Sequence, residues 1–411
     1  MRRTGPPEHP SPAASPDDGE WADRADLDVS RAVGRVLDDV LGERLAQAAG
    51  IDPTFARDVA ARVARFTTGG GKRIRSRFLW WGFRACPGAE PGRTGAVAAL
   101  RLAAAVELVQ TCALAHDDVM DGSGLRRGAP SLHARFAAQY PAADGAGPGA
   151  GFATAAAVLA GDLSLAWADD LVTATELPAA TRHRVHASWR AMRTEMAAGQ
   201  YLDVQGQVTG SRSPARALRV AYLKSALYSV ERPLHLGMAL AGADARTVRA
   251  VRAAGRCAGL AFQLRDDILG LFGDPRATGK PSGGDIRDGK ATYLMTVARS
   301  RARADGDRDA LTLIDGCLGD ARLPEARLAR LRDTLTETGT RARVEREIDG
   351  LVRHSCRLLE SAPLEPVARH RLQELIRVVA GARPAGSAGT GRADDRVPLA
   401  RLVAAARGRI R

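Results

Sequence analysis

Three aspartates at the end of an apolar segment form the most chemically distinctive cluster in the sequence. They lie in Asp-Asp-Val-Met-Asp at 117–121, directly after the apolar stretch 97–114. On a helix, spacings of three and four residues place Asp117 and Asp118 on the same face as Asp121. Clustered carboxylates at the end of a buried helix repel one another unless a cation lies among them. Mg²⁺ commonly uses one or two carboxylates together with substrate phosphates, so we expect a magnesium site here.

A pair of arginines follows this first cluster. Arg126 and Arg127 precede a glycine. Arginines bind phosphate in a bidentate geometry, so carboxylates beside arginines are understandable when a metal-bound polyphosphate lies between them. The competing interpretation is a surface salt-bridge cluster without a ligand.

A second aspartate pair ends another apolar helical pattern. Asp266 and Asp267 lie within 262–270, and Gly-Asp-Pro at 273–275 closes the segment. A glycine-rich stretch at 279–285 comes next. Other Asp-Asp pairs occur in the chain, so the pair alone carries little information, and its apolar context singles it out.

Lysine is nearly absent from a very basic chain. Only four of the 60 basic residues are lysine, and the sequence contains no asparagine. A compositional bias has converted almost every cation to arginine, so the remaining lysines are candidates for positions that need a compact ammonium group, which binds phosphate as a point charge. They lie near glycine-rich turns, carboxylates or a hydroxyl, and they are Lys72, Lys224, Lys280 and Lys290.

The elements that must position these residues are helices throughout. A helical pattern begins near Asp28, and a second follows Asp52-Pro53, which is a helix-start signal, until three glycines at 69–71 break it. No stretch shows sustained strand alternation, so we predict an all-α fold. Further patterns occur at about 74–85, 94–118, 153–173, 178–208, 215–241, 245–271, 291–304, 307–318, 324–338, 340–361 and 365–381.

Composition limits the class of protein. The five cysteines are widely spaced without a Cys-x-x-Cys pair, which favours a reducing cytoplasm over a disulfide framework. We expect no signal peptide and no apolar run long enough to cross a membrane. The net charge is +13, but the basic residues are dispersed and aromatics form only 4% of the chain, so nucleic-acid binding is not expected.

Taken in order, these motifs resemble those of the trans-isoprenyl diphosphate synthase (polyprenyl synthetase) family, especially bacterial geranylgeranyl diphosphate synthases. The resemblance covers roughly 30–380 and implies a large single-domain, isoprenoid synthase-like helical bundle around a central cavity. We expect that domain over 27–383, a disordered tail over 1–26 and a flexible basic tail over 384–411. The motifs are Gly-Gly-Lys-x-x-Arg at 70–75, Asp-Asp-x-x-Asp with Arg-Arg-Gly, Gly-Gln at 199–200, Lys-Ser at 224–225, Phe-Gln-x-x-Asp-Asp at 262–267 and Gly-Lys…Asp…Lys at 279–290.

The resemblance also implies roles for individual residues. Catalysis is expected from Asp117, Asp121, Asp266, Lys224 and Arg126. Mg²⁺ ligands match Asp117, Asp121 and Asp266, with Asp118 and Asp267 beside them. The isopentenyl diphosphate site matches Lys72, Arg75, Gln110 and Arg127, and the allylic diphosphate site matches Arg126, Lys224 and Lys280, with Ser225, Gln263 and Lys290 nearby.

Three positions depart from the family pattern. Ser76 stands where a proline usually follows the first motif, and we expect little effect. Gly270 stands where the second motif usually ends in aspartate, which weakens one metal or neighbouring contact, although Asp274 is one turn further on. The loop after Lys280 contains two glycines before Asp285, so its register relative to the family pattern is less well defined.

The family reaction is ionisation of an allylic diphosphate, condensation with isopentenyl diphosphate and loss of a proton, for which the departing pyrophosphate is the expected acceptor. His116 adjoins the first cluster but is expected to be structural. The hydrocarbon product needs a dry channel along the helix that carries Asp117. Small residues at Cys112 and Ala113, with Val109 one turn deeper, favour geranylgeranyl diphosphate or a longer product over farnesyl diphosphate.

Alternative functions remain open at this point. The chain could be a longer-chain polyprenyl diphosphate synthase, or an inactive regulatory subunit of such an enzyme, which Gly270 favours weakly. A terpene cyclase on the same fold typically needs an asparagine in its second metal motif, and this chain has none. Family resemblance alone leads us to expect a homodimer.

Overall fold

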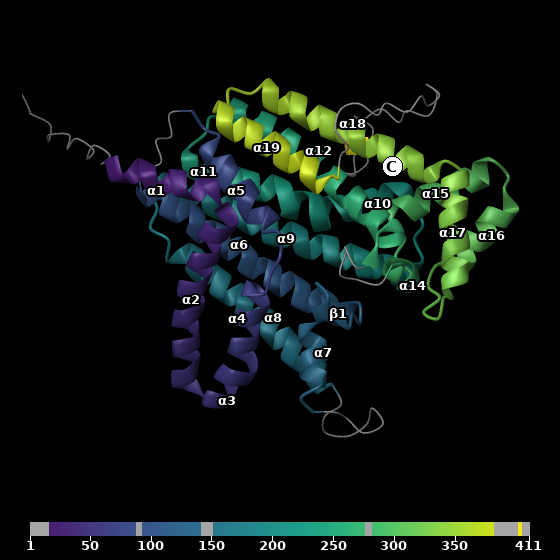
Figure 1. Cartoon of the computed structure of the whole chain (residues 1–411), viewed down its shortest axis with the longest axis horizontal. Helices are drawn as coiled ribbons and strands as arrows, with labels where there is room; N and C mark the ends of the chain where they lie inside the picture. The colour runs from purple at the N-terminus through teal and green to yellow at the C-terminus, as the bar shows by residue number, and fades with distance from the viewer. Residues whose placement is uncertain (1–15, 88–92, 141–150, 276–281, 382–401, 405–411) are drawn as a thin grey trace, which may run out of the picture.

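The computed structural model describes residues 16–87, 93–140, 151–275, 282–381 and 402–404, and within them it confirms the all-α prediction (Figure 1). The only strands described there are β1 (Leu125–Arg126) and β2 (Ala129–Pro130). Each has two residues, and they pair antiparallel as a hairpin. The helices are α1 (Pro16–Leu27), α2 (Val29–Ile51), α3 (Pro53–Phe55), η1 (Ala56–Ala60), α4 (Ala61–Thr68), α5 (Ile74–Arg84), α6 (Arg93–Met120), α7 (Leu132–Ala137), α8 (Phe152–Thr173), α9 (Ala179–Thr209), α10 (Pro214–Val220), η3 (Ala221–Glu231), α11 (Arg232–Ala241), α12 (Ala245–Phe272), α14 (Gly284–Arg287), α15 (Tyr293–Ala304), α16 (Arg308–Cys317), α17 (Glu325–Glu337), α18 (Thr340–Glu360) and α19 (Pro366–Val379).

Helix boundaries follow the capping chemistry of the sequence. Asp28 accepts a hydrogen bond from the Arg31 amide at the start of α2, and Asp52 accepts one from the Phe55 amide, with Pro53 at the first helical position. These contacts satisfy amide groups that have no partner inside the helix. The start signals at Asp28 and Asp52-Pro53 are therefore confirmed.

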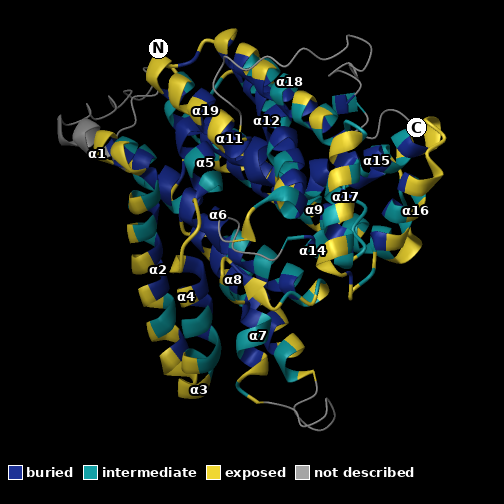
Figure 2. Ribbon diagram, turned by 45° about the vertical axis from the view of Figure 1, so that its right-hand side comes forward, coloured by how far each residue is buried: buried dark blue, intermediate teal, exposed yellow. Residues whose placement is uncertain are grey.

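Helix α6 runs through the centre of the molecule, and its buried face is dark blue in Figure 2. The sequence predicts no segment able to cross a membrane, yet by length and hydropathy Thr94–Met120 is a candidate. In the structure, 72% of its most apolar window is buried against other helices. Such burial is typical of a core helix, so the candidate is weak evidence for a membrane span.

The N-terminal boundary predicted from sequence is wrong. The predicted disordered tail includes residues 16–26, but these form most of α1, in which Ala22 and Ala25 are buried. Asp26 accepts hydrogen bonds from Trp80 Nε1 (2.7 Å) and from Arg84 of α5. Apolar alanines and this ionic contact hold α1 against the bundle, whereas its short Pro- and Asp-rich sequence carries no strong helical pattern. Residues 1–15 and most of 384–411 lie outside the described residues.

Glycines allow α5 and α11 to pack with their backbones in contact. A Cβ atom added to Gly237 would lie 2.1 Å from the Leu79 carbonyl oxygen, and one added to Gly82 would lie 2.7 Å from the Leu234 carbonyl oxygen. Each glycine therefore makes room for the backbone of the other helix. This crossing fixes α5, whose first turn carries Arg75.

Helix η3 is an 11-residue π-helical segment, with a wider turn than the α-helix, between α10 and α11. Pro233 lies at the start of α11 and lacks the N–H that an α-helix would direct at the Ser229 carbonyl. A π-helical register is one way to accommodate such a lost bond, and π segments often occur at functional sites. Lys224 and Ser225 lie in this segment.

The backbone contact at Gly237 yields a stability prediction. We expect Gly237→Ala to lower the free energy of unfolding by about 3 kcal/mol, because the new methyl group must push α11 away from α5. Thermal or denaturant unfolding measures the change. Gly34→Ala is the matched control, because nothing lies within 4 Å of its added Cβ. The control should be neutral or slightly stabilising, and equal melting temperatures for the two variants would contradict the proposed packing.

Candidate active site

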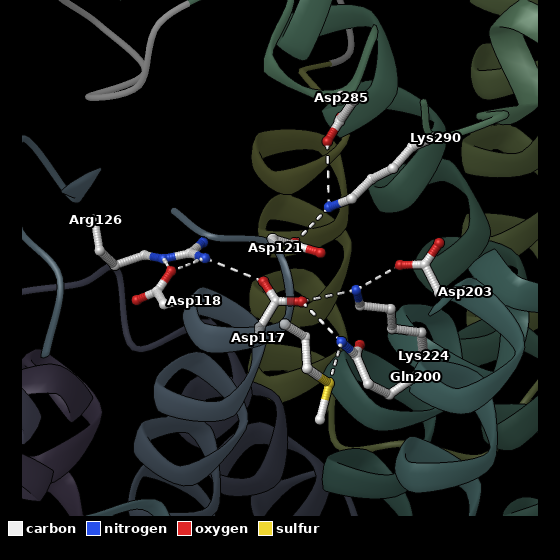
Figure 3. A network of polar contacts seen from close by, with 10 residues as sticks. Asp117, Asp118, Asp121, Arg126, Gln200, Asp203, Lys224, Asp285 and Lys290 are labelled. Atoms are coloured by element: carbon white, nitrogen blue, oxygen red, sulfur yellow. Dashed lines mark hydrogen bonds and ion pairs between the residues drawn. The ribbon is translucent and has the colours of Figure 1, made fainter. Parts of the chain in front are cut away.

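Asp117 lies at the centre of a polar network at the C-terminal end of α6 (Figure 3). One carboxylate oxygen accepts hydrogen bonds from Lys224 Nζ (2.9 Å) and Gln200 Nε2 (3.2 Å). The other oxygen accepts one from an Arg126 guanidinium nitrogen at 3.0 Å. Helices α6, α9 and η3 and the β-hairpin thus converge on this one carboxylate.

Asp121 and the second half of the molecule are joined by Lys290. Its ammonium group lies 2.5 Å from Asp121 Oδ2 and 3.6 Å from Asp285 Oδ1. Lys290 follows α14, so it connects the first aspartate cluster with the loop that comes after α12 (Figure 3). Lys290 therefore joins the first aspartate cluster to the Gly-Lys…Asp…Lys motif at 279–290.

Asp118 occupies a different environment from its neighbours. Its side chain is fully buried and forms an ion pair with Arg126, whose Nε lies 2.8 Å from Oδ1. Arg126 also contacts Asp117, so one guanidinium bridges both members of the pair. Asp118 holds Arg126 in place, while Asp117 and Asp121 face the two lysines.

Close helix packing positions Lys224. A Cβ atom added to Gly199 of α9 would lie 2.3 Å from the Lys224 amide nitrogen, so α9 and η3 touch at this point. Lys224 Nζ donates to Asp203 (2.7 Å), one turn along α9 from Gly199. Ser225 is the next residue of η3 and is half-buried.

The second cluster lies at the end of α12. Asp266 is exposed, whereas Asp267 is only 8% exposed and accepts a hydrogen bond from Gln263 Nε2 at 2.9 Å. Asp267 lines a small cavity together with Gly270 and Asp285. A Cβ atom added to Gly270 would lie 3.2 Å from Asp285 Oδ2, so Asp285 occupies the neighbourhood into which an aspartate at 270 would extend. Asp274 is exposed.

The surrounding charges move the carboxylate pKa values in opposite directions. Burial alone would raise the pKa of Asp117, but Lys224, Lys290 and Arg126 outweigh it and hold that pKa below its usual range. Burial and the nearby Asp117 charge raise the pKa of Asp121, against the effect of Lys290. Burial, with Asp285 and Asp266 nearby, raises the pKa of Asp267 to about 8.

A second cationic region surrounds the glycine-rich turn before α5. Lys72 is exposed, and Arg75 donates to Ser229 (2.7 Å) with its guanidinium 4.5 Å from the centre of the Tyr228 ring. Tyr228 in turn donates to Gln110 Oε1 at 2.9 Å.

Arg127 closes this region from the hairpin side. It donates to the Gly70 carbonyl at 2.7 Å and has a left-handed backbone. Burial lowers the pKa of Arg127, and the charges of Arg73, Arg126 and Arg75 add to the effect against Glu107. Such a concentration of cations suits an anionic ligand such as a diphosphate.

The residues expected to control chain length lie on α6 below the aspartates. Val109 and Cys112 are buried, and Ala113 is half-buried. Cys112 Sγ lies 3.7 Å from His116 Nδ1, and burial raises the pKa of the thiol to about 12. His116 Nε2 lies 3.1 Å from the Val158 carbonyl oxygen of α8, which fits the expected structural role.

The sequence analysis missed two residues of this network, Asp203 and Glu107. Gln200 and Asp285 appear there only as members of motifs, without a role of their own. A periodicity argument could have found Asp203, since it lies three residues after Gln200 on the same helix. Lys280 lies outside the described residues.

The donor set at the first cluster suits a divalent metal that binds together with its substrate. Among the described residues, no three His, Cys, Asp or Glu side chains form a ready-made metal cage. Mg²⁺ rarely uses such a cage, because it keeps several waters and binds one or two carboxylates with substrate phosphates. Asp117 and Asp121 supply hard oxygen donors one helical turn apart, so the residues fit Mg²⁺ bound together with a diphosphate.

Comparison with known proteins gives a consistent result. A family model described as polyprenyl synthetase matches residues 58–316. A geranylfarnesyl diphosphate synthase from Aeropyrum pernix is 31% identical over 248 residues, which cover 60% of this chain and 70% of the relative. A farnesyl diphosphate synthase from Geobacillus stearothermophilus is 34% identical over 243 residues, covering 57% of this chain and 74% of the relative.

Solved structures with the same fold include a ligand-bound example. A geranylgeranyl pyrophosphate synthase from Corynebacterium glutamicum, complexed with isoprenyl diphosphate and magnesium, has a TM-score of 0.78 and 36% identity, over 85% of this chain and 99% of that one. A polyprenyl synthase from Caulobacter crescentus, complexed with calcium and isoprenyl diphosphate, has a TM-score of 0.69 and 26% identity, over 91% and 100% of the two chains.

The raised pKa of Asp267 predicts a pH-dependent stability in the metal-free protein. The folded state keeps a proton up to about pH 8, while the unfolded chain, with a pKa near the ordinary 3.8, releases it earlier. The contribution of Asp267 to the free energy of unfolding is therefore fully present below its pKa in the unfolded chain. It is lost as the pH rises toward its pKa in the folded state. We expect Asp267→Asn, which stays neutral, to become more stable than the wild type by a few kcal/mol as the pH rises from 5 to about 8.

Urea unfolding with a chelator present, at a series of pH values, measures this difference. Asp38→Asn on the exposed face of α2 is the control for a lost surface charge. If the curves for Asp267→Asn and the wild type stay parallel over this range, Asp267 ionises normally and the assignment is wrong.

Proposed function

The chain belongs to the polyprenyl synthetase family, and from that premise we propose that it condenses isopentenyl diphosphate with an allylic diphosphate to give all-trans geranylgeranyl diphosphate. Its class is that of the prenyl diphosphate synthases, which are trans-prenyltransferases. The product and the roles of individual residues are the proposed part. The observation that carries the proposal is the convergence of Arg126, Lys224 and Lys290 on Asp117 and Asp121.

We assign the metal to the two aspartate clusters. Asp117, Asp121 and Asp266 would hold Mg²⁺, with Asp118 and Asp267 beside them. When bound, Mg²⁺ supplies positive charge that stabilises the diphosphate leaving group. The C. glutamicum relative that is 36% identical was solved with magnesium and an isoprenyl diphosphate, which supports this choice.

The cations of the site bind the two substrates. Lys224 and Lys290 now neutralise carboxylates, and in the proposed complex their N–H groups turn to the allylic diphosphate together with Arg126. Lys280 and Ser225 are placed in the same role by family resemblance, with Gln263 near them. Lys72, Arg75, Gln110 and Arg127 bind isopentenyl diphosphate. Preorganised donors of this kind stabilise the charge that develops as the allylic C–O bond breaks.

No protein nucleophile takes part in the proposed reaction. The double bond of isopentenyl diphosphate attacks the allylic carbon, and a proton then passes to the departing pyrophosphate. His116 is unsuited as a base because its ring contacts the Val158 carbonyl and packs against Gly161. The apolar side chains of α6 and α8 exclude water that would otherwise trap the allylic cation.

Product length is the least determined part of the function. Curated relatives include farnesyl, geranylgeranyl and geranylfarnesyl diphosphate synthases. The small side chains of Cys112 and Ala113, and the 36% identity to a geranylgeranyl pyrophosphate synthase, support a C20 product. A longer polyprenyl product is the second candidate.

The remaining proposals concern assembly and location. We assign a homodimer and a cytoplasmic location by family resemblance. Val158 and Leu159 of α8 are 38% and 62% exposed, and this apolar face supports a contact between two copies. All five cysteines are buried and free, as a reducing compartment permits. The catalytic domain is proposed to span 27–383, with α1 added at its N-terminus.

Removing a carboxylate tests the metal assignment. We expect Asp117→Ala and Asp266→Ala each to lower turnover by on the order of a thousand-fold, because the charge on the leaving diphosphate loses its counter-ion. The assay supplies isopentenyl and dimethylallyl diphosphates with and without Mg²⁺, and circular dichroism checks the fold. Asp39→Ala, from the exposed pair on α2, is the control and should be fully active. Near-normal turnover in either site variant would refute its role, and an inactive wild type would favour a regulatory subunit.

A bulky side chain below the aspartates tests the channel. We expect Ala113→Phe or Cys112→Phe to shorten the product toward farnesyl diphosphate, because a phenyl ring one turn below Asp117 fills the space of the last isoprene unit. Consumption of the allylic substrate should continue. Mass analysis of the products and thermal melting are measured on the same variants. A folded, active variant with unchanged product length would remove that position from the channel.

A further inference from the structure

Ser76 is the departure from the family pattern for which the structure supplies a partner. Its side chain is fully buried in the first turn of α5. The hydroxyl lies 2.6 Å from Glu107 Oε1 and 3.1 Å from the Ala103 carbonyl oxygen, both on α6. The shorter distance identifies Glu107 as the principal acceptor, and a hydrogen bond to a carboxylate is stronger than one to a carbonyl. A proline here could not donate this bond.

Glu107 is a buried carboxylate that also binds Arg73. It is 6% exposed, and its second oxygen, Oε2, accepts a hydrogen bond from an Arg73 guanidinium nitrogen at 3.1 Å. The two carboxylate oxygens are thus divided between one hydroxyl and one guanidinium. With Ser76 present, the carboxylate is held from both sides, and its rotation away from Arg73 would break a charge-assisted bond.

Arg73 in turn holds the glycine-rich turn. Its backbone lies in the left-handed region (φ 46°), which is unfavourable for a side chain with a Cβ atom. Such a conformation persists when surrounding contacts determine it. The contacts here are the ion pair with Glu107 and a 2.9 Å hydrogen bond to the Thr67 carbonyl at the end of α4.

This turn presents the cations proposed to bind isopentenyl diphosphate. Lys72 precedes Arg73 directly, and Arg75 follows two residues later. Arg127 reaches the same turn through the Gly70 carbonyl, and a Cβ atom added to Gly71 would lie 3.2 Å from its guanidinium. A shift of the turn would therefore move all three cations relative to one another.

We infer that Ser76 is a positioning residue for the isopentenyl diphosphate site: its hydroxyl orients Glu107, which fixes Arg73 and with it the turn that carries Lys72. The inference rests on the proposed function, because it assigns a purpose to the turn at that site. Ser76 itself touches no substrate in this scheme. The sequence alone predicts little effect from the departure at this position.

Two substitutions remove the hydroxyl in different ways. Ser76→Ala leaves a smaller side chain, whereas Ser76→Pro restores the family residue. Position 76 is the third residue of α5, where the amide has no acceptor inside the helix, so proline is tolerated there. A common effect of both variants is therefore due to the lost donor and not to volume or helix disruption.

Steady-state kinetics with each substrate varied in turn is the main test. We expect both variants to raise KM for isopentenyl diphosphate roughly tenfold, the effect of one lost charge-assisted bond. The kcat at saturation and KM for the allylic diphosphate should stay within about twofold of the wild type. Ser355→Ala is the matched control, because Ser355 is also fully buried and donates to the Ala254 carbonyl (2.9 Å) between α18 and α12. It should lower the melting temperature without changing either KM.

Calorimetric titration with isopentenyl diphosphate alone separates this inference from the proposed function. If the wild type does not bind isopentenyl diphosphate, the proposed function fails. If the wild type binds it and both Ser76 variants bind equally well, the inference is overturned while the function stands. The inference is also overturned if the Ser76 variants melt earlier, as Ser355→Ala does, with both KM values unchanged.

Discussion

The arrangement of this protein depends on two carboxylates at the C-terminal end of a buried apolar helix: Asp117 in its last turn and Asp121 directly after it. The C-terminal end of a helix carries partial negative charge, so Asp117 and Asp121 lie where further negative charge is least favourable. Positive charge must come from elsewhere in the chain. Arg126 supplies it from the hairpin, Lys224 from η3 and Lys290 from the segment after α14. In the proposed function, binding of substrate and metal would exchange one set of counter-ions for another.

Close backbone packing positions one of these cations, Lys224, beside the carboxylates. Gly199 lets α9 touch η3 at Lys224, and Gly259 of α12 would place an added Cβ atom 2.5 Å from the Ala226 carbonyl oxygen on the other side of η3. The π-helical segment is thus held between two helices at positions without side chains. Because interiors are close-packed, the ammonium group of Lys224 has a narrow range of positions. The chain's arginine bias makes the retained lysine notable: its single ammonium nitrogen donates to both Asp117 and Asp203, a contact that a planar guanidinium would make with a different geometry.

Sequence patterns predicted the fold closely because capping residues and helical periodicity are local signals. Asp28 and Asp52 mark the starts of α2 and α3 as expected, and Lys224 and Lys290 lie against the first aspartate cluster. Features that depend on tertiary contact were missed. Helix α1 is stabilised by Asp26 reaching Trp80, and η3 has a π register that no periodicity reveals. Glu107 and Asp203 act through partners distant in sequence, so their contacts could be identified only in the folded chain.

The contact between α1 and α5 affects how a shortened version of the protein should be designed. The segment matched by the family model, residues 58–316, looks like a natural fragment to express. Cutting there would delete Asp26 and leave the indole N–H of Trp80 and the guanidinium of Arg84 without that acceptor. It would also discard α18, whose Ser355 donates to α12. The segment that sequence comparison matches is therefore shorter than the segment whose contacts stabilise the folded protein.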